Sequence, residues 1–94
     1  MAANSGETWR DVFTNWPAAI PRRGVIVSTL NEPVPFKSFF LKGDTLLLER
    51  TNPDTLGARF VVMAYESIHL VKLIDPIKES VFNQAGYAGQ LAKN

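Results

Sequence analysis

The sequence predicts a mainly β fold, in which a short N-terminal helix precedes a five-stranded, strongly bent antiparallel sheet that forms a small barrel. The first observation is a long hairpin: residues 36–50, FKSFFLKGDTLLLER, are an apolar run, a Gly-Asp turn and three leucines before a charged end. The second is a set of further β-branched or aromatic runs at 25–30, 59–65 and 68–74. The third is a helical spacing of apolar residues near the start of the chain.

Length and composition indicate one ordinary domain. The chain has 94 residues, of which 46% are apolar and 20% charged. A chain of this size buries about 60 to 65% of its unfolded surface, so one modest core is expected. We expect a single domain over residues 1–94, with a helix at about 5–16, a barrel at about 24–75 and a C-terminal tail at about 77–94.

Residues 5–16 have the pattern of a short amphipathic helix. Large apolar side chains recur at i, i+3, i+4 and i+7 on one face: Trp9, Val12, Phe13 and Trp16. Asn4 or Ser5 suits the N-cap, and Pro17 ends the helix because a proline pushes the preceding residue out of the α region. So short a helix is marginal alone, so we expect its tryptophans to cover the barrel.

The first three predicted strands are residues 25–30, 34–41 and 45–50. Simple alternation along the second strand places Phe36 and Phe40 on one face and Phe39 on the other. Apolar groups on both faces are expected of a long bent strand that contributes to two halves of a barrel. Lys42, Gly43 and Asp44 form the turn into the third strand.

The fourth and fifth predicted strands are residues 59–65 and 68–74. A loop with strong turn chemistry, TNPDTLG at 51–57, precedes them. Only Glu66 and Ser67 separate the two strands, which indicates a tight turn or a sharp bend. Asp75 and Pro76 suit the N-cap and first position of one helical turn, and we expect a frayed tail beyond Asn83.

This order of elements resembles the Sm-like family, which includes a bacterial Sm-like RNA chaperone. The residues that carry the resemblance are GVIVSTL, FKSFFLKGDTLLLER and VVMAYESIHLVKL, and the pattern extends over residues 9–74. The run DTLLLERTNPDTLGAR further resembles a bacterial branch of these small barrels to which no activity attaches. The resemblance implies an SH3-type barrel, assembly into rings and, in the RNA-binding members, a site in the loops.

The loops suggest which residues would contact RNA. Lys42 and Tyr65 combine a charge with a stacking ring, and Arg22 and Arg23 precede a glycine where they would grip a phosphate. Glu66 stands where RNA-binding relatives carry a cation, and its charge repels phosphate. Single-stranded RNA binding is therefore the alternative function, and a solvated turn with a strand-end tyrosine is the simpler interpretation.

Composition argues against several other function classes. The net charge of +1 creates no broad field for nucleic acid or anionic membranes, and the absence of cysteine excludes disulfides and thiolate chemistry. His69 is the only histidine, so we expect no metal site, no cofactor and no enzyme. No apolar run reaches the ~18 residues of a membrane span, and no signal-peptide pattern begins the chain, so we expect a cytoplasmic protein without membrane partners.

The edges of the sheet carry the leading functional prediction. An incompletely closed five-stranded sheet leaves unpaired backbone groups at residues 59–65 and 68–74, and neither run has the prolines or dense charge that block pairing. Pairing one edge with the other edge of a neighbouring copy would satisfy them and could close a ring. We therefore expect a non-catalytic homo-oligomeric scaffold or interaction module. A C-terminal segment covering the edge is the other possibility.

Overall fold

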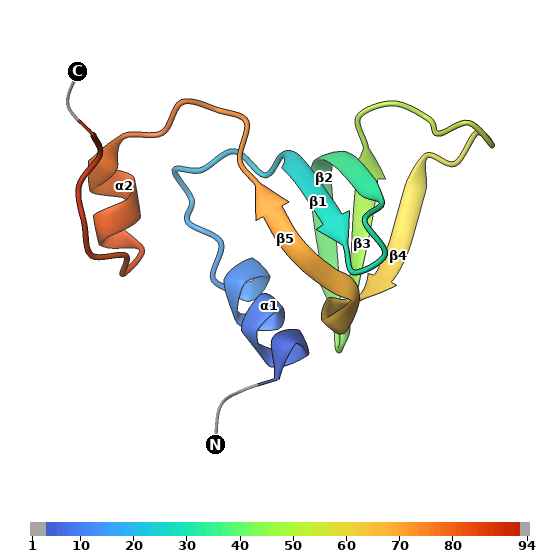
Figure 1. Cartoon of the computed structure of the whole chain (residues 1–94), viewed down its shortest axis with the longest axis horizontal. Helices are drawn as coiled ribbons and strands as arrows, with labels where there is room; N and C mark the ends of the chain where they lie inside the picture. Colours follow the sequence, from blue (N-terminus) through green and yellow to red (C-terminus); the bar gives the residue numbers. More distant parts are fainter. Residues whose placement is uncertain (1–3, 93–94) are drawn as a thin grey trace.

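The computed structural model of the chain describes residues 4–92 as one sheet with a helix packed on it and a C-terminal helix standing to one side (Figure 1). The mainly β class and the order of elements agree with the prediction. The elements are α1 (Ser5–Thr14), β1 (Gly24–Ser28), β2 (Pro33–Lys42), β3 (Thr45–Arg50), β4 (Phe60–Ala64), the 3₁₀ turn η1 (Tyr65–Ser67), β5 (Ile68–Lys72) and α2 (Glu79–Gln84).

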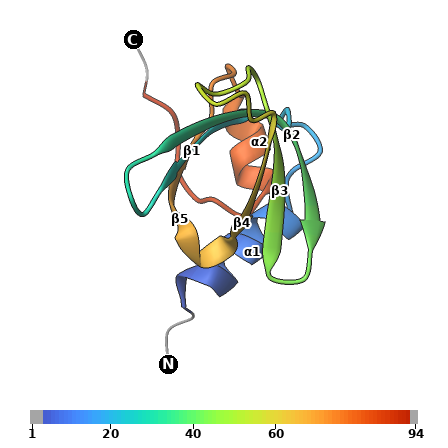
Figure 2. The ribbon, with the colours of Figure 1, turned by 90° about the vertical axis from the view of Figure 1, so that its right-hand side faces the viewer.

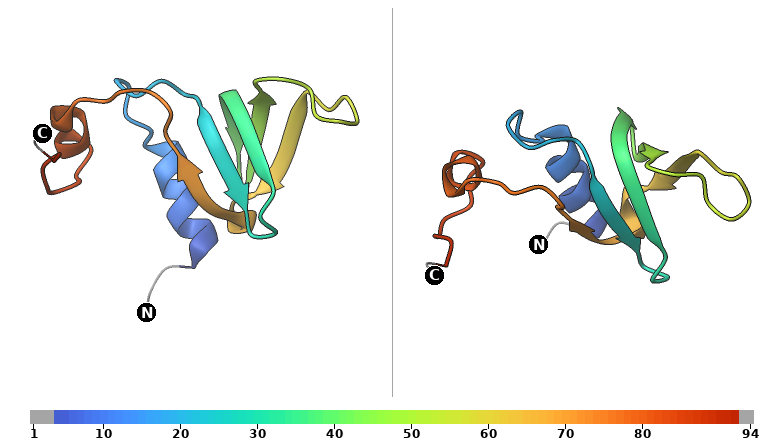
Figure 3. Two further views of the ribbon diagram at one scale, coloured as in Figure 1. Left: turned by 45° about the horizontal axis from the view of Figure 1, so that its top comes forward. Right: turned by 90° about the horizontal axis from the view of Figure 1, so that it is seen from above.

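The five strands form one antiparallel sheet in the order β4-β3-β2-β1-β5. The sheet is strongly twisted and curved, with β4 and β5 at its two ends (Figures 2 and 3). No ladder joins β4 to β5 in the described part of the chain, so the sheet is open. The closed barrel expected from the sequence therefore stays a prediction.

A bulge in β2 changes which phenylalanines enter the core. The β2–β3 register shifts between Phe36, which faces Arg50, and Ser38, which faces Glu49, so Lys37 is an extra residue. An extra residue reverses the alternation of the strand. Phe36 and Phe39 are both buried as a result, whereas Phe40 is 61% exposed. The prediction that Phe36 and Phe40 share a face was wrong for this reason.

The core lies between the sheet and α1, and Phe13 is its centre. The Phe13 ring meets Phe39 edge-on, with centroids 4.9 Å apart, and stacks on Trp16 at 5.4 Å. Both tryptophans are half-buried against this cluster, which agrees with their expected role as a cover. Such aromatic pairs add about 0.5–1.5 kcal/mol each beyond the area they bury. The docking of α1 therefore depends on a few rings.

Element ends differ from the prediction where a side chain finds an unforeseen partner. The helix α1 ends at Thr14, with Asn15 as its C-cap, whose backbone and side-chain amides donate to the carbonyl of Asp11. The helix α2 begins at Glu79, with Lys78 as N-cap, and not at Asp75. The two carboxylate oxygens of Asp75 instead accept hydrogen bonds from Nε of Arg23, at distances of 3.0 and 2.9 Å.

Candidate functional site

The two arginines proposed for phosphate binding are both engaged within the chain. Arg22 donates from Nη2 to the carbonyl oxygen of Phe39 at 3.0 Å, and its guanidinium carbon lies 3.8 Å from the centroid of that ring. Arg23 forms a two-pronged ion pair with Asp75, which lowers the pKa of that carboxyl below its usual value. Each arginine thus ties the 17–24 connector to another part of the chain, and the charge of Arg23 is paired with that of Asp75.

Tyr65 is buried, so it presents no open face to a nucleotide base. Its residue is 2% exposed, and its ring centroid lies 6.3 Å from that of Phe13. Burial raises the pKa of the phenol, and the hydroxyl has no hydrogen-bond partner within residues 4–92. A turn position with apolar neighbours in sequence could have indicated this burial, but the resemblance to RNA-binding loops favoured a stacking role.

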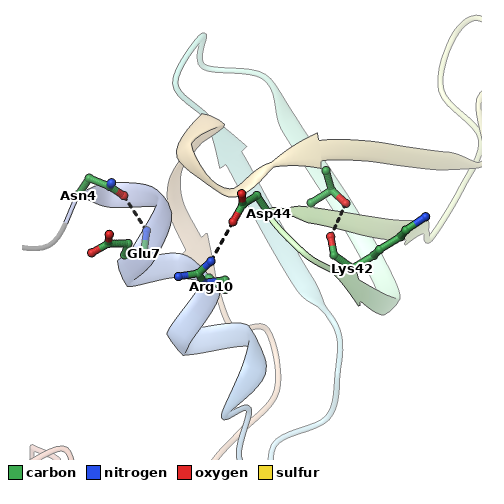
Figure 4. A network of polar contacts seen from close by, with 6 residues as sticks. Asn4, Glu7, Arg10, Lys42 and Asp44 are labelled. Atoms are coloured by element: carbon green, nitrogen blue, oxygen red, sulfur yellow. Dashed lines mark hydrogen bonds and ion pairs between the residues drawn. The ribbon is translucent and has the colours of Figure 1, made fainter.

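Lys42 is exposed at the end of β2, and its side chain extends away from Asp44 and α1 (Figure 4). Nearby, Arg10 Nη1 lies 2.8 Å from Asp44 Oδ1 and ties α1 to the β2–β3 turn. Both partners of this pair are solvent-exposed, so it contributes under about 1 kcal/mol. Among the described residues no hydrogen bond or ion pair joins any two of the four predicted RNA contacts. Tyr65 is buried and the two arginines contact Phe39 and Asp75, so the structure does not present the four residues as one open RNA-binding surface.

A small depression beside this ion pair has mixed charge. Its volume is about 330 Å³, and it lies between the start of α1 and η1. Asn4 Oδ1 accepts the N–H of Glu7 at 2.8 Å there, which occupies one of the helix's free donors (Figure 4). Asp44, Glu7 and Glu66 outnumber Arg10 among its charged residues. Three carboxylates against one guanidinium do not suit a phosphate.

Residues 4–92 contain neither a metal-binding cluster nor a membrane-spanning helix. No three His, Asp or Glu side chains in that range gather closely enough to hold a metal ion. His69 is exposed on β5 and belongs to no such cluster within residues 4–92. No helix in the same range has the length and apolar character needed to cross a bilayer.

The free edge of β4 is the most distinctive feature of the surface. Arg50 N–H donates to the carbonyl of Arg59, and Tyr65 N–H donates to that of Asp44, at the two ends of the β3–β4 ladder. Antiparallel ladders alternate, so within β4 only Val61 and Met63 bond to β3. Phe60, Val62 and Ala64 therefore turn their N–H and C=O groups to the open side, where no strand within residues 4–92 pairs with them.

An apolar row crosses the outer face of the sheet and ends at this edge. The register places Phe40 of β2 beside Leu47 of β3, and Leu47 beside Val62 of β4. Phe40 is 61% exposed, Val62 65% and Phe60 57%. Exposed apolar groups that adjoin each other in this way mark interaction surfaces more often than isolated ones do. The free edge was predicted from the sequence, but the exposure of Phe40 was not. The residues of β2 do not reveal the bulge that turns Phe40 to the outer face.

Comparison with protein-family models, with curated proteins and with solved structures finds no match to this chain. The surface of the molecule, above all the β4 edge and its apolar row, is therefore the best guide to its function.

Proposed function

We propose that this protein is a non-catalytic, Sm-like small barrel that assembles with copies of itself and acts as a scaffold or interaction module. The observation that carries the proposal is that both outer strands of the sheet, β4 and β5, have a free edge within residues 4–92. The β4 edge is also apolar on its outer face. β4 contains no charged residue and no proline, so it has none of the devices by which edge strands avoid pairing.

The link between β4 and β5 supports a barrel. These strands are at opposite ends of the sheet order, yet only the three residues of η1 separate them. In a flat sheet, four spacings of about 4.8 Å would put the two edges roughly 19 Å apart. Four residue steps span at most about 14 Å when fully extended, and a 3₁₀ turn spans less. The sheet must therefore curl until the edges approach each other at this end.

The two edges suit head-to-tail pairing. β4 and β5 are each five residues long, and the open side of β4 carries the backbone groups of Phe60, Val62 and Ala64. Pairing β4 of one copy with β5 of the next would satisfy these groups and cover the exposed Phe60 and Val62 side chains. Because such a contact joins two different surfaces, it closes into a ring when the rotation between copies allows it.

Light scattering of the purified protein at tens of micromolar tests the proposal. We expect a mass of several chains for the wild type and a shift toward the monomer for Val62→Lys, which places a charge on the paired edge. Leu56→Lys is the matched control, because Leu56 is 94% exposed in the protruding 51–59 loop (Figure 1). A monomeric wild type at this concentration, or equal effects of the two substitutions, would refute assembly through β4.

A further inference from the structure

A large apolar cleft separates α1 from the C-terminal segment, defined here as residues 79–91. Its volume is about 610 Å³, within the range of small-molecule sites. One wall consists of α1, the connector that follows it and the end of β5. The other wall is α2 with the chain after it, which lies on the side of α1 away from the sheet (Figure 1). The aromatic residues in the lining are Trp9, Trp16, Phe82 and Tyr87.

The C-terminal segment keeps its shape without filling this cleft. α2 has no buried residue, and Glu79 Oε1 accepts the N–H of Leu91 at 2.6 Å, which folds the segment onto itself. Tyr87 and Leu91 line the cleft and are still 60% and 50% exposed. The radius of gyration is 14.1 Å, whereas about 12 Å is typical of a compact chain of this length. The cleft is thus open and lined by apolar groups with few partners.

The charge of the lining is one-sided. Of the nine Lys and Arg residues within residues 4–92, none lines the cleft, and neither does His69. Its charged groups are the carboxylates of Asp11 and Glu79. Asn15 donates to Oδ1 of Asp11, and the other oxygen of that carboxylate accepts no hydrogen bond within residues 4–92. Carboxylates combined with aromatic rings attract an organic cation and repel an anion.

From this combination we propose that the cleft binds a small organic cation with an apolar body, of the alkylammonium or arylammonium class. The apolar part lies against Trp9, Trp16 and Phe82, and the ammonium group lies near Asp11 and Glu79. The cleft lies at the β5 end of the sheet, where Val71 and Leu73 line it, and not at the β4 edge. The binding chemistry comes from α1 and the C-terminal segment, but β5 is also an edge used in the proposed assembly, so the site is tested with and without assembly.

Intrinsic fluorescence tests the site directly, because Trp9 and Trp16 are the only tryptophans of the chain and both line the cleft. The probes are octyltrimethylammonium, octanol and octanoate, each below its micelle concentration. We expect saturable changes with the ammonium probe at concentrations at least about fivefold lower than with octanoate, since one cation–aromatic contact alone gives a few-fold preference. Equal affinity for the cation and the anion, or no response to the cation, would overturn the proposal.

The double variant Asp11→Asn with Glu79→Gln tests the carboxylates while keeping the oxygen atoms that accept hydrogen bonds. It should reduce the preference for the cation over octanoate toward unity. Glu32→Gln, in the β1–β2 turn, removes a carboxylate outside the cleft and should leave the preference unchanged. An undiminished preference in the double variant would refute the roles of Asp11 and Glu79.

A second copy of the chain is the competing occupant of the cleft. If it fills the cleft, tryptophan emission will change on dilution of the protein alone, and the ammonium probe will bind more weakly as the protein concentration rises. We expect neither effect. The titration is repeated on Val62→Lys, which we expect to be shifted toward the monomer. Binding of the ammonium probe is thereby measured independently of assembly, so failure of one proposal can be told apart from failure of the other.

Discussion

At the scale of single residues, the hydroxyl of Tyr65 has an environment that is energetically unfavourable. It is buried and has no partner within residues 4–92, and a buried polar group without a hydrogen bond costs about 1–3 kcal/mol. We expect Tyr65→Phe, which keeps the ring contacts with Phe13, to leave the free energy of unfolding unchanged or to raise it by up to about 1 kcal/mol.

Urea denaturation of Tyr65→Phe measures this effect. Tyr65→Ala is the control, because removing the ring should cost about 3–5 kcal/mol. A loss of more than about 1 kcal/mol in Tyr65→Phe would show that an ordered water or another group satisfies the hydroxyl.

The ion pair of Arg23 and Asp75 makes stability depend on acidity. The side-chain hydrogen bonds from Arg23 lower the pKa of Asp75 in the folded chain. A group whose folded pKa is lowered contributes stability above its unfolded pKa of about 3.9 and loses that contribution as pH falls through the folded value. The stability advantage of the wild type over Asp75→Asn should therefore be full at pH 7 and shrink below about pH 4.

Thermal unfolding of the wild type and Asp75→Asn from pH 7 down to pH 2 checks this dependence. Arg23→Gln, which removes the other partner, should show the same convergence with the wild type at low pH. A difference in melting temperature between wild type and Asp75→Asn that is constant over the whole range would contradict the role of the ionised carboxylate.

At the scale of elements, the junction of β1 and β5 requires a glycine. Gly24 is buried, and a Cβ built on it would overlap the backbone carbonyl oxygen of Lys72. Because a backbone atom cannot rotate aside, we expect Gly24→Ala to lower the free energy of unfolding by about 1–3 kcal/mol and to weaken hydrogen-exchange protection in β5.

Gly43→Ala is the matched control for this substitution. Gly43 has open space around its Cα but a φ of 55°, so alanine there should cost about 1 kcal/mol through backbone strain alone. Its effect should be confined to the β2–β3 turn. Unchanged protection of β5 amides in Gly24→Ala would contradict the close approach.

Elements were predictable where local signals agree. The bounds of β3 follow from three leucines between a Gly-Asp turn and a loop. The edge positions of β4 and β5 were expected from the resemblance to Sm-like barrels, because two apolar runs joined by a short turn would by themselves indicate a hairpin. The start of α2 was not predictable, because the partner that removes Asp75 from its expected cap is Arg23, 52 residues away in sequence. The burial of Phe39 depends on a bulge whose position no single residue marks.

The candidate site was predictable only in part, for a related reason. The free backbone groups of β4 follow from the strand order, which the resemblance to Sm-like barrels led us to expect. The cleft beside α1 depends on where the C-terminal segment lies, and α2 has no buried residue to fix that position from its pattern. Long-range placement of weakly packed segments leaves little trace in local sequence, so neither the cleft nor its carboxylates were foreseen.

At the scale of the whole molecule, the distribution of charge separates the scaffold from the RNA-binding ring. Arg22 and Arg23 are held by Phe39 and Asp75, and Tyr65 is buried, so Lys42 is the one predicted RNA contact that is exposed and whose side chain makes no hydrogen bond or ion pair within residues 4–92. Asp44 and Glu66 lie in the adjoining turns. One lysine per chain beside two carboxylates gives little counterion release from a phosphate backbone.

We therefore expect no detectable binding of a fluorescein-labelled single-stranded oligouridine at low salt, measured by fluorescence anisotropy with protein at tens of micromolar. A ring would repeat Lys42 around its axis, so the measurement requires the assembled wild type, with Val62→Lys as the dissociated control. RNA binding that weakens steeply with salt and disappears in Lys42→Ala would overturn this prediction and favour the RNA-binding ring. Because a ring concentrates weak sites, such binding would also be lost in Val62→Lys even though Lys42 is intact there.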